Sequence, residues 1–173
     1  MIRIITNILA VAALATAVEA APSQAQEAMT KDKLVGTWRM ISFKAMTGNQ
    51  ITYPLGERPS GLIAYTPSRI WVMTIDSDRK PPASATLTDT EAVSLMRSHT
   101  AYTGKYDVDP AQTPDGIKIV IHADFASNQA IAGTDRAFFV RVDGNKLTIK
   151  SPATLAPSTG LISSVQVECV KAD

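Results

Sequence analysis

The chain has 173 residues, of which 45% are hydrophobic and 19% are charged, and its formal net charge is +1. This length suits one domain with a hydrophobic core, and the composition is that of a globular chain rather than a disordered one. A net charge close to zero, without a local run of Lys and Arg, argues against binding to nucleic acid or to an anionic membrane surface.

The first 25 residues have the layout of a secretory signal peptide. Arg3 precedes an apolar run over residues 4–18, and small-residue cleavage sites follow at Ala20 and Ala25. A retained membrane anchor is the alternative, but the run is short for a span of about 20 residues. No Cys follows the run, which argues against a lipoprotein anchor. We therefore expect cleavage after Ala20 or Ala25, export to the periplasm or the medium, and no stable membrane insertion afterwards.

A polar lead-in at residues 26–33 is followed by short segments in which apolar and polar side chains alternate. Such alternation indicates half-buried strands. The intervening segments contain Gly, Pro, Asn and Ser, which favour turns. The segments predicted as strands are residues 35–43, 51–53, 62–66, 70–75, 102–108, 117–122, 136–142, 146–150 and 161–170.

One segment has helical periodicity instead. Residues 88–91 (Thr-Asp-Thr-Glu) match a capping box, and Ala92, Met96 and His99 follow at helical spacing. The pattern predicts one helix over about residues 89–100. We expect its apolar face to pack against, or cover, the rim of the structure that the strands form.

Eight or nine antiparallel strands joined by short turns predict an all-β fold, in which a meander closes into a barrel around residues 34–173. Closure removes the exposed edge strands. An antiparallel barrel of about eight strands is wide enough inside for side chains or for one small ligand.

A set of short motifs runs in a fixed order over about residues 34–150. The motifs are Leu34-Val35-Gly36-Thr37-Trp38, Tyr53-Pro54 with Gly56, Gly61-Leu62-Ile63-Ala64-Tyr65-Thr66-Pro67, Ala101-Tyr102-Thr103-Gly104-Lys105-Tyr106-Asp107-Val108, His122, Gly133-Thr134, and Asp143-Gly144-Asn145-Lys146-Leu147. Together they resemble the lipocalin-like domain family of bacterial and fungal proteins. The resemblance implies a lipocalin-like β-barrel with a central cavity, and it implies no common reaction. The family often has an arginine beside the aromatic strand 136–141, where Arg136 and Arg141 are the candidates to stack over Trp38.

Aromatic side chains supply most of the candidates for the lining of such a cavity. Trp38 offers the largest apolar surface, and Tyr53, Tyr65, Tyr102 and Tyr106 all fall within the family-like motifs. Binding pockets are mostly apolar with a few polar groups, and buried tyrosines usually find a partner for the hydroxyl. A tyrosine-lined pocket therefore competes with an interpretation of these residues as ordinary core.

The two histidines are the remaining cavity candidates. His99, on the apolar side of the predicted helix, is a candidate base or ligand anchor, and the alternative is a helix-end histidine near the last carbonyl groups. His122 lies opposite Ile117, Ile119 and Ile121 in the alternation. An inward isoleucine face turns His122 outward, whereas the family similarity favours the cavity, so its direction stays open.

No motif for a phosphate-binding loop, a metalloprotease or a redox pair of cysteines occurs in the sequence. Two histidines and one cysteine argue against a structural zinc site, and we predict no metal and no cofactor. Cys169 shares a face with Val165 and Val167, which indicates a small buried side chain rather than a reactive thiol.

Three functions follow from these patterns. The first is an exported barrel that binds a small apolar or amphipathic molecule. The second is a barrel enzyme, of the isomerase, cyclase or hydrolase type, with His99 or His122 as base and a cavity tyrosine as acid. The third is a structural or interaction module with a filled barrel. A histidine near a tyrosine at the cavity floor would favour the enzyme. A cavity lined only by apolar residues would favour the binder. The filled barrel stays a candidate if the cavity is smaller than about 300 Å³.

Overall fold

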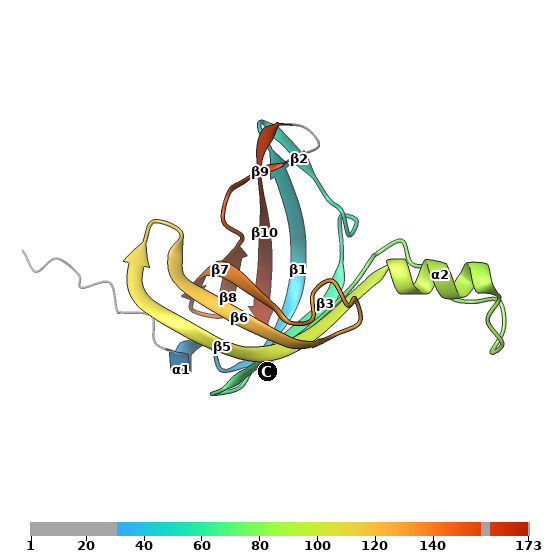
Figure 1. The fold of residues 1–173 in the computed structure, drawn as a ribbon, viewed down its shortest axis with the longest axis horizontal. Coiled ribbons are helices and arrows are strands. Elements are labelled where there is room, and N and C mark those ends of the chain that lie inside the picture. The colour runs from blue at the N-terminus through green and yellow to red at the C-terminus, as the bar shows by residue number, and fades with distance from the viewer. Residues whose placement is uncertain (1–30, 157–159, 173) are drawn as a thin grey trace, which may run out of the picture.

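The computed structural model describes residues 31–156 and 160–172, and the predicted signal peptide lies outside these residues. The described chain is an all-β structure with two short helices, in which eight antiparallel strands close into a barrel (Figure 1). The predicted fold class is therefore confirmed. No helix in the described part combines the length and apolarity that a membrane crossing requires.

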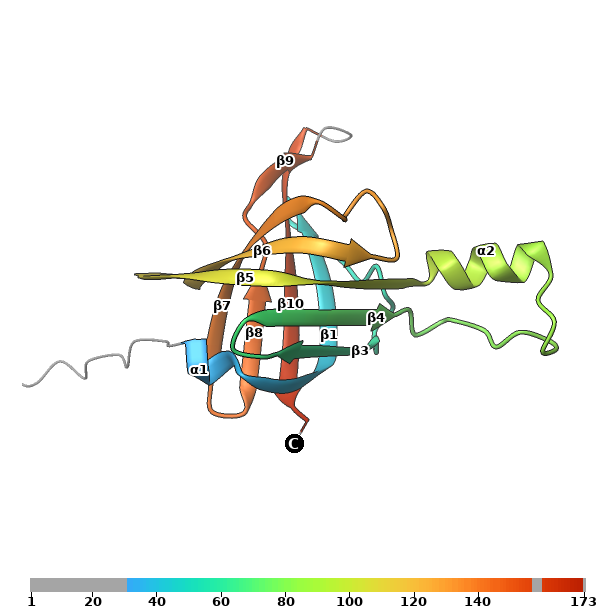
Figure 2. The same cartoon turned by 60° about the horizontal axis from the view of Figure 1, so that its bottom comes forward.

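The barrel is a ring of sequential neighbours with one closing contact. Its strands follow the order β1-β3-β4-β5-β6-β7-β8-β10, and β10 pairs with β1, while β2 and β9 extend the sheet beyond the ring (Figures 1 and 2). In chain order the elements are α1 (Lys31–Leu34), β1 (Gly36–Thr47), β2 (Gln50–Thr52), β3 (Ser60–Tyr65), β4 (Arg69–Ile75), α2 (Asp89–Arg97), β5 (His99–Thr113), β6 (Gly116–Ala126), β7 (Thr134–Asp143), β8 (Lys146–Lys150), β9 (Thr154–Ala156) and β10 (Leu161–Lys171).

The closing contact joins the first and last long strands. β1 and β10 pair from Trp38 opposite Lys171 to Thr47 opposite Ser163, with a register shift between Met40 and Ser42. A β-bulge inserts one extra residue into a strand and changes its phase. The closure leaves neither long strand with a free edge along this ladder.

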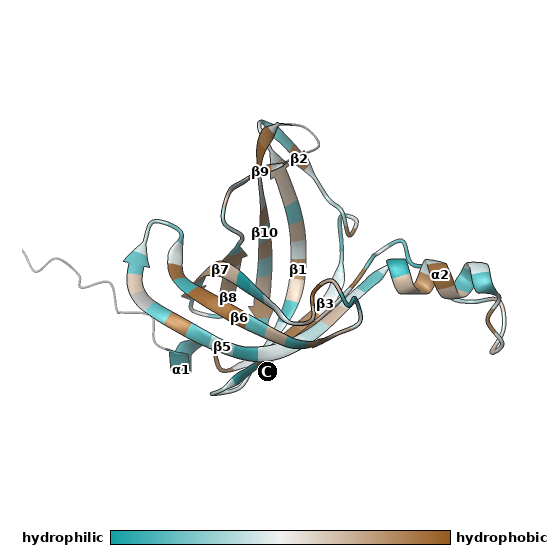
Figure 3. Ribbon diagram, viewed as in Figure 1, coloured by the Kyte–Doolittle hydropathy of each residue, from teal (hydrophilic) through white to brown (hydrophobic). Residues whose placement is uncertain are grey.

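Alternate residues of each barrel strand point inward and form one hydrophobic core. Hydrophobic, brown stretches are prominent along β6 (Figure 3). Ile117, Ile119 and Ile121 of β6 are all buried, so the isoleucine face is the inner one. The buried core residues are Leu34, Trp38, Met40, Ile63, Tyr65, Ile70, Val72, Tyr106, Ile117, Ile119, Ile121, Val140, Leu147, Ile149, Val167 and Cys169.

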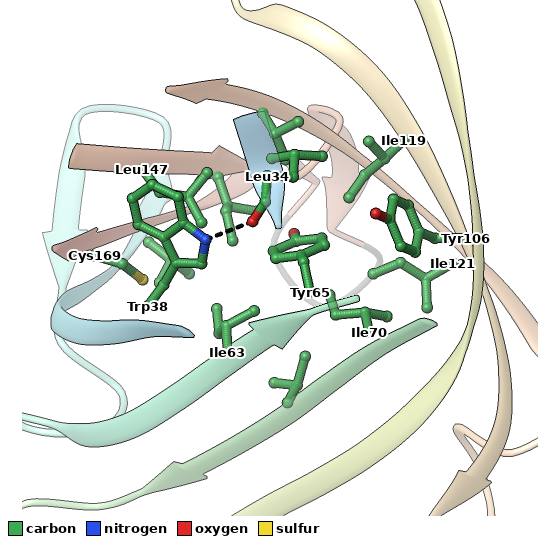
Figure 4. Packing of buried hydrophobic residues seen from close by; sticks show 14 of the residues in the cluster. Leu34, Trp38, Ile63, Tyr65, Ile70, Tyr106, Ile119, Ile121, Leu147 and Cys169 are labelled. Carbon is green, nitrogen blue, oxygen red and sulfur yellow. Dashed lines mark hydrogen bonds between the residues drawn. The ribbon is translucent and has the colours of Figure 1, made fainter. Parts of the chain in front are cut away.

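One end of the barrel is filled by Trp38 together with the short helix α1. The indole of Trp38 is completely buried, and its Nε1–H donates a hydrogen bond of 2.8 Å to the carbonyl of Leu34 (Figure 4). Leu34 is equally buried. The ammonium of Lys31 lies 4.3 Å from the ring centroid of Tyr106. Residues 31–33, expected as part of a polar lead-in, thus join Leu34 in a helical turn that packs on the barrel.

Glycine is needed at two positions of the barrel, one beside α1 and one between β5 and β6. Gly36 connects α1 to β1 with a φ of 131°, a backbone region that favours glycine. At Gly104 an added Cβ would lie 2.1 Å from the carbonyl oxygen of His122. β5 and β6 therefore approach closely at this point because Gly104 has no side chain.

Strands β5 and β9 depart from the sequence prediction. β5 continues past Asp109-Pro110, which we expected to end it, and the ladder with β6 shifts register between Asp109 and Gln112. Proline removes a ladder hydrogen bond and is tolerated at such irregularities. The short strand β9 falls in a segment expected to be a bend, because three residues are too few to show alternation.

Helix α2 begins where the capping box predicts, ends at Arg97 rather than near residue 100, and does not cover the barrel. Thr88 Oγ1 accepts a hydrogen bond from the Glu91 N–H (3.3 Å), and the Glu91 carboxylate accepts one from the Thr88 N–H (2.9 Å), which completes the capping box. None of its side chains is buried, and it stands away from the barrel (Figures 1 and 2). The expectation that its apolar face covers the rim is wrong, because the connection between β4 and β5 carries it outward.

The two tryptophans provide a matched test of this core. We expect Trp38→Ala to lower the free energy of unfolding by about 3–5 kcal/mol, the usual cost of deleting a buried large side chain. Trp71→Ala, on the outer face of β4 with 54% of the side chain exposed, should cost about 1 kcal/mol or less. Urea denaturation of the mature protein measures both. Equal losses for the two variants would contradict the placement of Trp38 in the core.

Candidate functional site: the barrel cavity

A cavity of about 280 Å³ lies inside the barrel, displaced from the end that Trp38 fills. Most of its wall is apolar. Leu55, from the connection between β2 and β3, and Ile131, from the connection between β6 and β7, complete it beside the strands. The lining residues are Met40, Phe43, Leu55, Ile63, Tyr65, Ile70, Val72, Thr74, Thr100, Tyr102, Ile121, Ile131, Arg136, Phe138, Ile149, Ser151, Val165 and Val167.

Tyr65 supplies one polar group to this wall. Its side chain is 2% exposed, and its ring packs edge-on against the ring of Tyr106, with centroids 5.4 Å apart (Figure 4). The buried hydroxyl has no hydrogen-bond partner in the described structure. Burial raises the pKa of Tyr65 well above its ordinary value, so the hydroxyl keeps its proton and remains a potential donor.

Arg136 supplies the charge. Its guanidinium carbon lies 5.4 Å from the ring centroid of Tyr102 and 5.7 Å from that of Phe138. The Nε atom of Arg136 is buried and has no hydrogen-bond partner among the described residues. Burial raises the pKa of Tyr102, and the neighbouring guanidinium of Arg136 acts in the opposite direction. A cation and two phenols therefore line one apolar cavity.

Sequence reasoning considered Arg136 only as a candidate to stack over Trp38. In the structure the cation over Trp38 is Lys171, whose Nζ lies 5.3 Å from the ring centroid. Arg136 has the same parity along β7 as Phe138 and Val140, which face inward. That shared parity is the signal that could have placed Arg136 in the cavity.

The predicted aromatic candidates divide between cavity and core. Tyr65 and Tyr102 line the cavity. Trp38 and Tyr106 are buried at the filled end, where the Tyr106 hydroxyl donates a hydrogen bond of 2.9 Å to the Thr66 carbonyl. Tyr53 follows β2 with 44% of its side chain exposed. These three lie outside the cavity, because Trp38 and Tyr106 occupy strand positions at the filled end and Tyr53 lies in an exposed connection.

His99 is the first residue of β5 and does not line the cavity. Its Nδ1 lies 3.0 Å from the Leu95 carbonyl in the last turn of α2. This is the geometry of a helix-end histidine, which was the alternative interpretation. Since α2 projects away from the barrel, His99 does not reach the interior.

His122 lies on the outer face of β6, in the direction that the inward isoleucines indicate. Its Nδ1 is 2.7 Å from Asp135 Oδ1 and its Nε2 is 3.0 Å from Asp107 Oδ2. Hydrogen bonds to Asp135 and Asp107 raise the pKa of the imidazole. Neither histidine therefore meets a cavity tyrosine, and the enzyme hypothesis lacks the base that it requires.

In the part of the chain that the structure describes, no group of three or more His, Cys, Asp or Glu side chains is arranged so that it could hold a metal ion. Cys169 is buried in the core, and burial raises the pKa of its thiol to about 12. A thiol in this state is a poor nucleophile, in agreement with its interpretation as a small core residue.

A model of the family described as lipocalin-like domain matches residues 35–165. The chain belongs to the lipocalin-like domain family. The resemblance carried by the sequence motifs is thus confirmed, and the matched region extends from the start of the barrel into β10. No curated protein and no solved structure matches the chain.

A hollow larger than the interior cavity lies outside the barrel of this lipocalin-like protein. A hollow of about 650 Å³ lies on the outer face of the sheet, where Leu62, Trp71, Met73 and Phe125 are exposed. Ligand sites typically bury most of a small molecule, whereas this hollow is an open surface groove. The cavity surrounded by the strands of the lipocalin-like barrel is therefore the candidate site.

The outward histidine gives a prediction for this lipocalin-like protein in solution. We expect His122 to titrate above about 6.5, the ordinary imidazole value, and the double variant Asp107→Asn/Asp135→Asn to lower its midpoint. A pKa raised by folding means that the stabilisation is complete below the unfolded pKa and disappears as the pH rises through the folded pKa. NMR titration of the imidazole measures the shift, and an unchanged midpoint in the double variant would contradict the geometry.

Proposed function

We propose that the protein is an exported binder that holds one small apolar or amphipathic molecule inside its barrel. The observation that carries this proposal is the cavity of about 280 Å³, which strands surround and whose wall is mostly apolar. Small-molecule sites have this character, with a few polar groups that fix orientation. The fold by itself does not choose a function, since one barrel architecture serves many.

The cavity volume limits the size of the ligand. At about 280 Å³ the cavity lies just below the range of about 300–1,000 Å³ that is typical of ligand sites. An apolar cavity of about 150 Å³ holds one benzene, so by proportion this cavity suits a molecule of about ten non-hydrogen atoms. The ligand is thus a small molecule rather than a long-chain lipid.

A structural or interaction module with a filled barrel is the competing function, since the cavity volume of about 280 Å³ is just below the value of about 300 Å³ expected for a ligand site. The polar atoms in the wall argue against it. Buried polar groups in a purely structural core are nearly always hydrogen-bonded, yet Tyr65 Oη and Arg136 Nε are buried without a partner in the described structure. The two atoms belong to residues that line the same cavity, which supports a site that a ligand completes.

Export rests on the sequence of residues 1–25, which has the charge, apolar run and cleavage sites of a signal peptide. The state of Cys169 is compatible with an oxidising destination. The one cysteine of the chain is buried and its thiol pKa is raised to about 12, so the folded protein presents little thiolate to oxidants.

A pair of valine variants on β10 tests the proposed function. Val167→Phe puts a bulkier, aromatic side chain into the cavity wall. Val170→Phe makes the same substitution on the same strand at a residue that does not line the cavity. Bound ligand should raise the melting temperature of the wild type and of Val170→Phe. We expect Val167→Phe to lose about tenfold or more in affinity.

Thermal shift with a panel of small apolar and amphipathic molecules, followed by titration calorimetry on the best of them, measures these affinities. The melting temperature of each ligand-free variant serves as the folding control. Two outcomes would contradict the proposal: no molecule of the panel stabilises the wild type, or both valine variants bind as tightly as the wild type does.

A further inference from the structure

The cavity contains a cation without a counter-charge. Arg136 projects from β7 among Tyr102, Phe138 and Ile121, which all line the cavity with it. In the described part of the chain no carboxylate forms an ion pair with its guanidinium, and its Nε has no hydrogen-bond partner. A partly buried charge without a partner costs free energy, and such charges are usually paired.

Acidic residues of the neighbouring strands are engaged elsewhere. Asp124 of β6 forms an ion pair with Arg69 (2.5 Å), and Asp135 of β7 lies 2.7 Å from His122. Both contacts are on the outer side of the barrel, where these side chains are substantially exposed. These two carboxylates therefore pair with Arg69 and His122 on the outer surface, and neither neutralises the charge of Arg136 in the interior.

We infer that the ligand of the cavity is a small amphipathic carboxylate whose head group binds Arg136. This inference rests on the proposed function, since it names the ligand class of the same cavity. The planar guanidinium fork matches a carboxylate with two parallel hydrogen bonds. The apolar part of the ligand lies against the aliphatic wall, for example Ile63, Val72 and Ile149.

Tyr65 is the second anchor. Tyr65 lines the same cavity as Arg136, and its hydroxyl is buried and lacks a partner in the described structure. The Tyr65 hydroxyl donates a hydrogen bond to the carboxylate head group, and the guanidinium of Arg136 neutralises the charge of that head group. One cation suits a singly charged carboxylate, because a phosphate monoester would bring a second negative charge into an apolar wall and leave it unpaired.

The test compares two probes that differ in charge and share their shape. Octanoate and octanamide are titrated into the mature protein at about pH 7, where the carboxylate is ionised. Homologous carboxylates and amides of about six to twelve carbons are included, so that a mismatch in length is not mistaken for a lack of binding. We expect the wild type to bind the acid about ten- to a hundredfold more tightly than the amide of equal length.

Three variants assign this preference to its residues. Arg136→Met removes the cation and should abolish the preference for the acid while the amide affinity is kept. Tyr65→Phe should reduce the affinity for the acid by about tenfold or less. Arg141→Met is the matched control, because Arg141 is an exposed arginine of the same strand, bonded to the Pro114 carbonyl, and should leave both affinities unchanged.

The melting temperature of ligand-free Arg136→Met provides a second readout. An uncompensated cation predicts that this variant melts at or above the wild-type temperature, whereas a purely structural arginine predicts a clear drop, which would overturn the inference. Equal binding of acid and amide by the wild type would also overturn it and would leave the proposed binding function intact. Failure of every acid and amide to bind would overturn the inference, whereas the proposed function fails only if the wider panel of small apolar and amphipathic molecules also does not stabilise the wild type.

Discussion

Closure of β1 on β10 is the constraint on which the rest of the structure depends. The ladder from Trp38–Lys171 to Thr47–Ser163 converts a long antiparallel meander into a ring, and a ring has one interior that its strands share. Trp38 and Leu34 fill one end of that interior. What remains toward the other end is the cavity, so the volume available to a ligand is set by how the barrel closes and how far its filled end extends.

Alternation in the sequence predicted most of this architecture. Strands with period two, such as the isoleucine strand β6, were placed correctly, whereas the direction of the isoleucine face, which the structure shows to be inward, stayed open in the sequence. The capping box likewise located the start of α2. Local patterns do not report where an element goes in space, and for this reason the position of α2 away from the barrel, the extension of β5 past Pro110 and the short pairing of β9 were not predicted.

The site was less accessible to sequence reasoning than the fold. Aromatic content selected Tyr65 and Tyr102, which line the cavity, and equally Trp38, Tyr53 and Tyr106, which do not. Depth along the barrel separates Trp38 and Tyr106 from the cavity residues, and this depth depends on the stagger between strands and on the bulge in β1, whereas Tyr53 lies in an exposed connection. Arg136 was predicted only as a candidate to stack over Trp38, although its parity on β7 is that of the inward residues Phe138 and Val140. The charge of the cavity comes from Arg136.

We propose that the barrel interior binds one small molecule and is not a filled core. Native mass spectrometry of the mature protein, purified gently from a periplasmic or culture fraction, tests it most directly. The account predicts a population heavier than the bare chain by the mass of one small molecule, and this mass should disappear on denaturation. A bare chain alone, together with failure of small carboxylates to bind when they are added back, would contradict it and indicate a barrel that functions without a ligand.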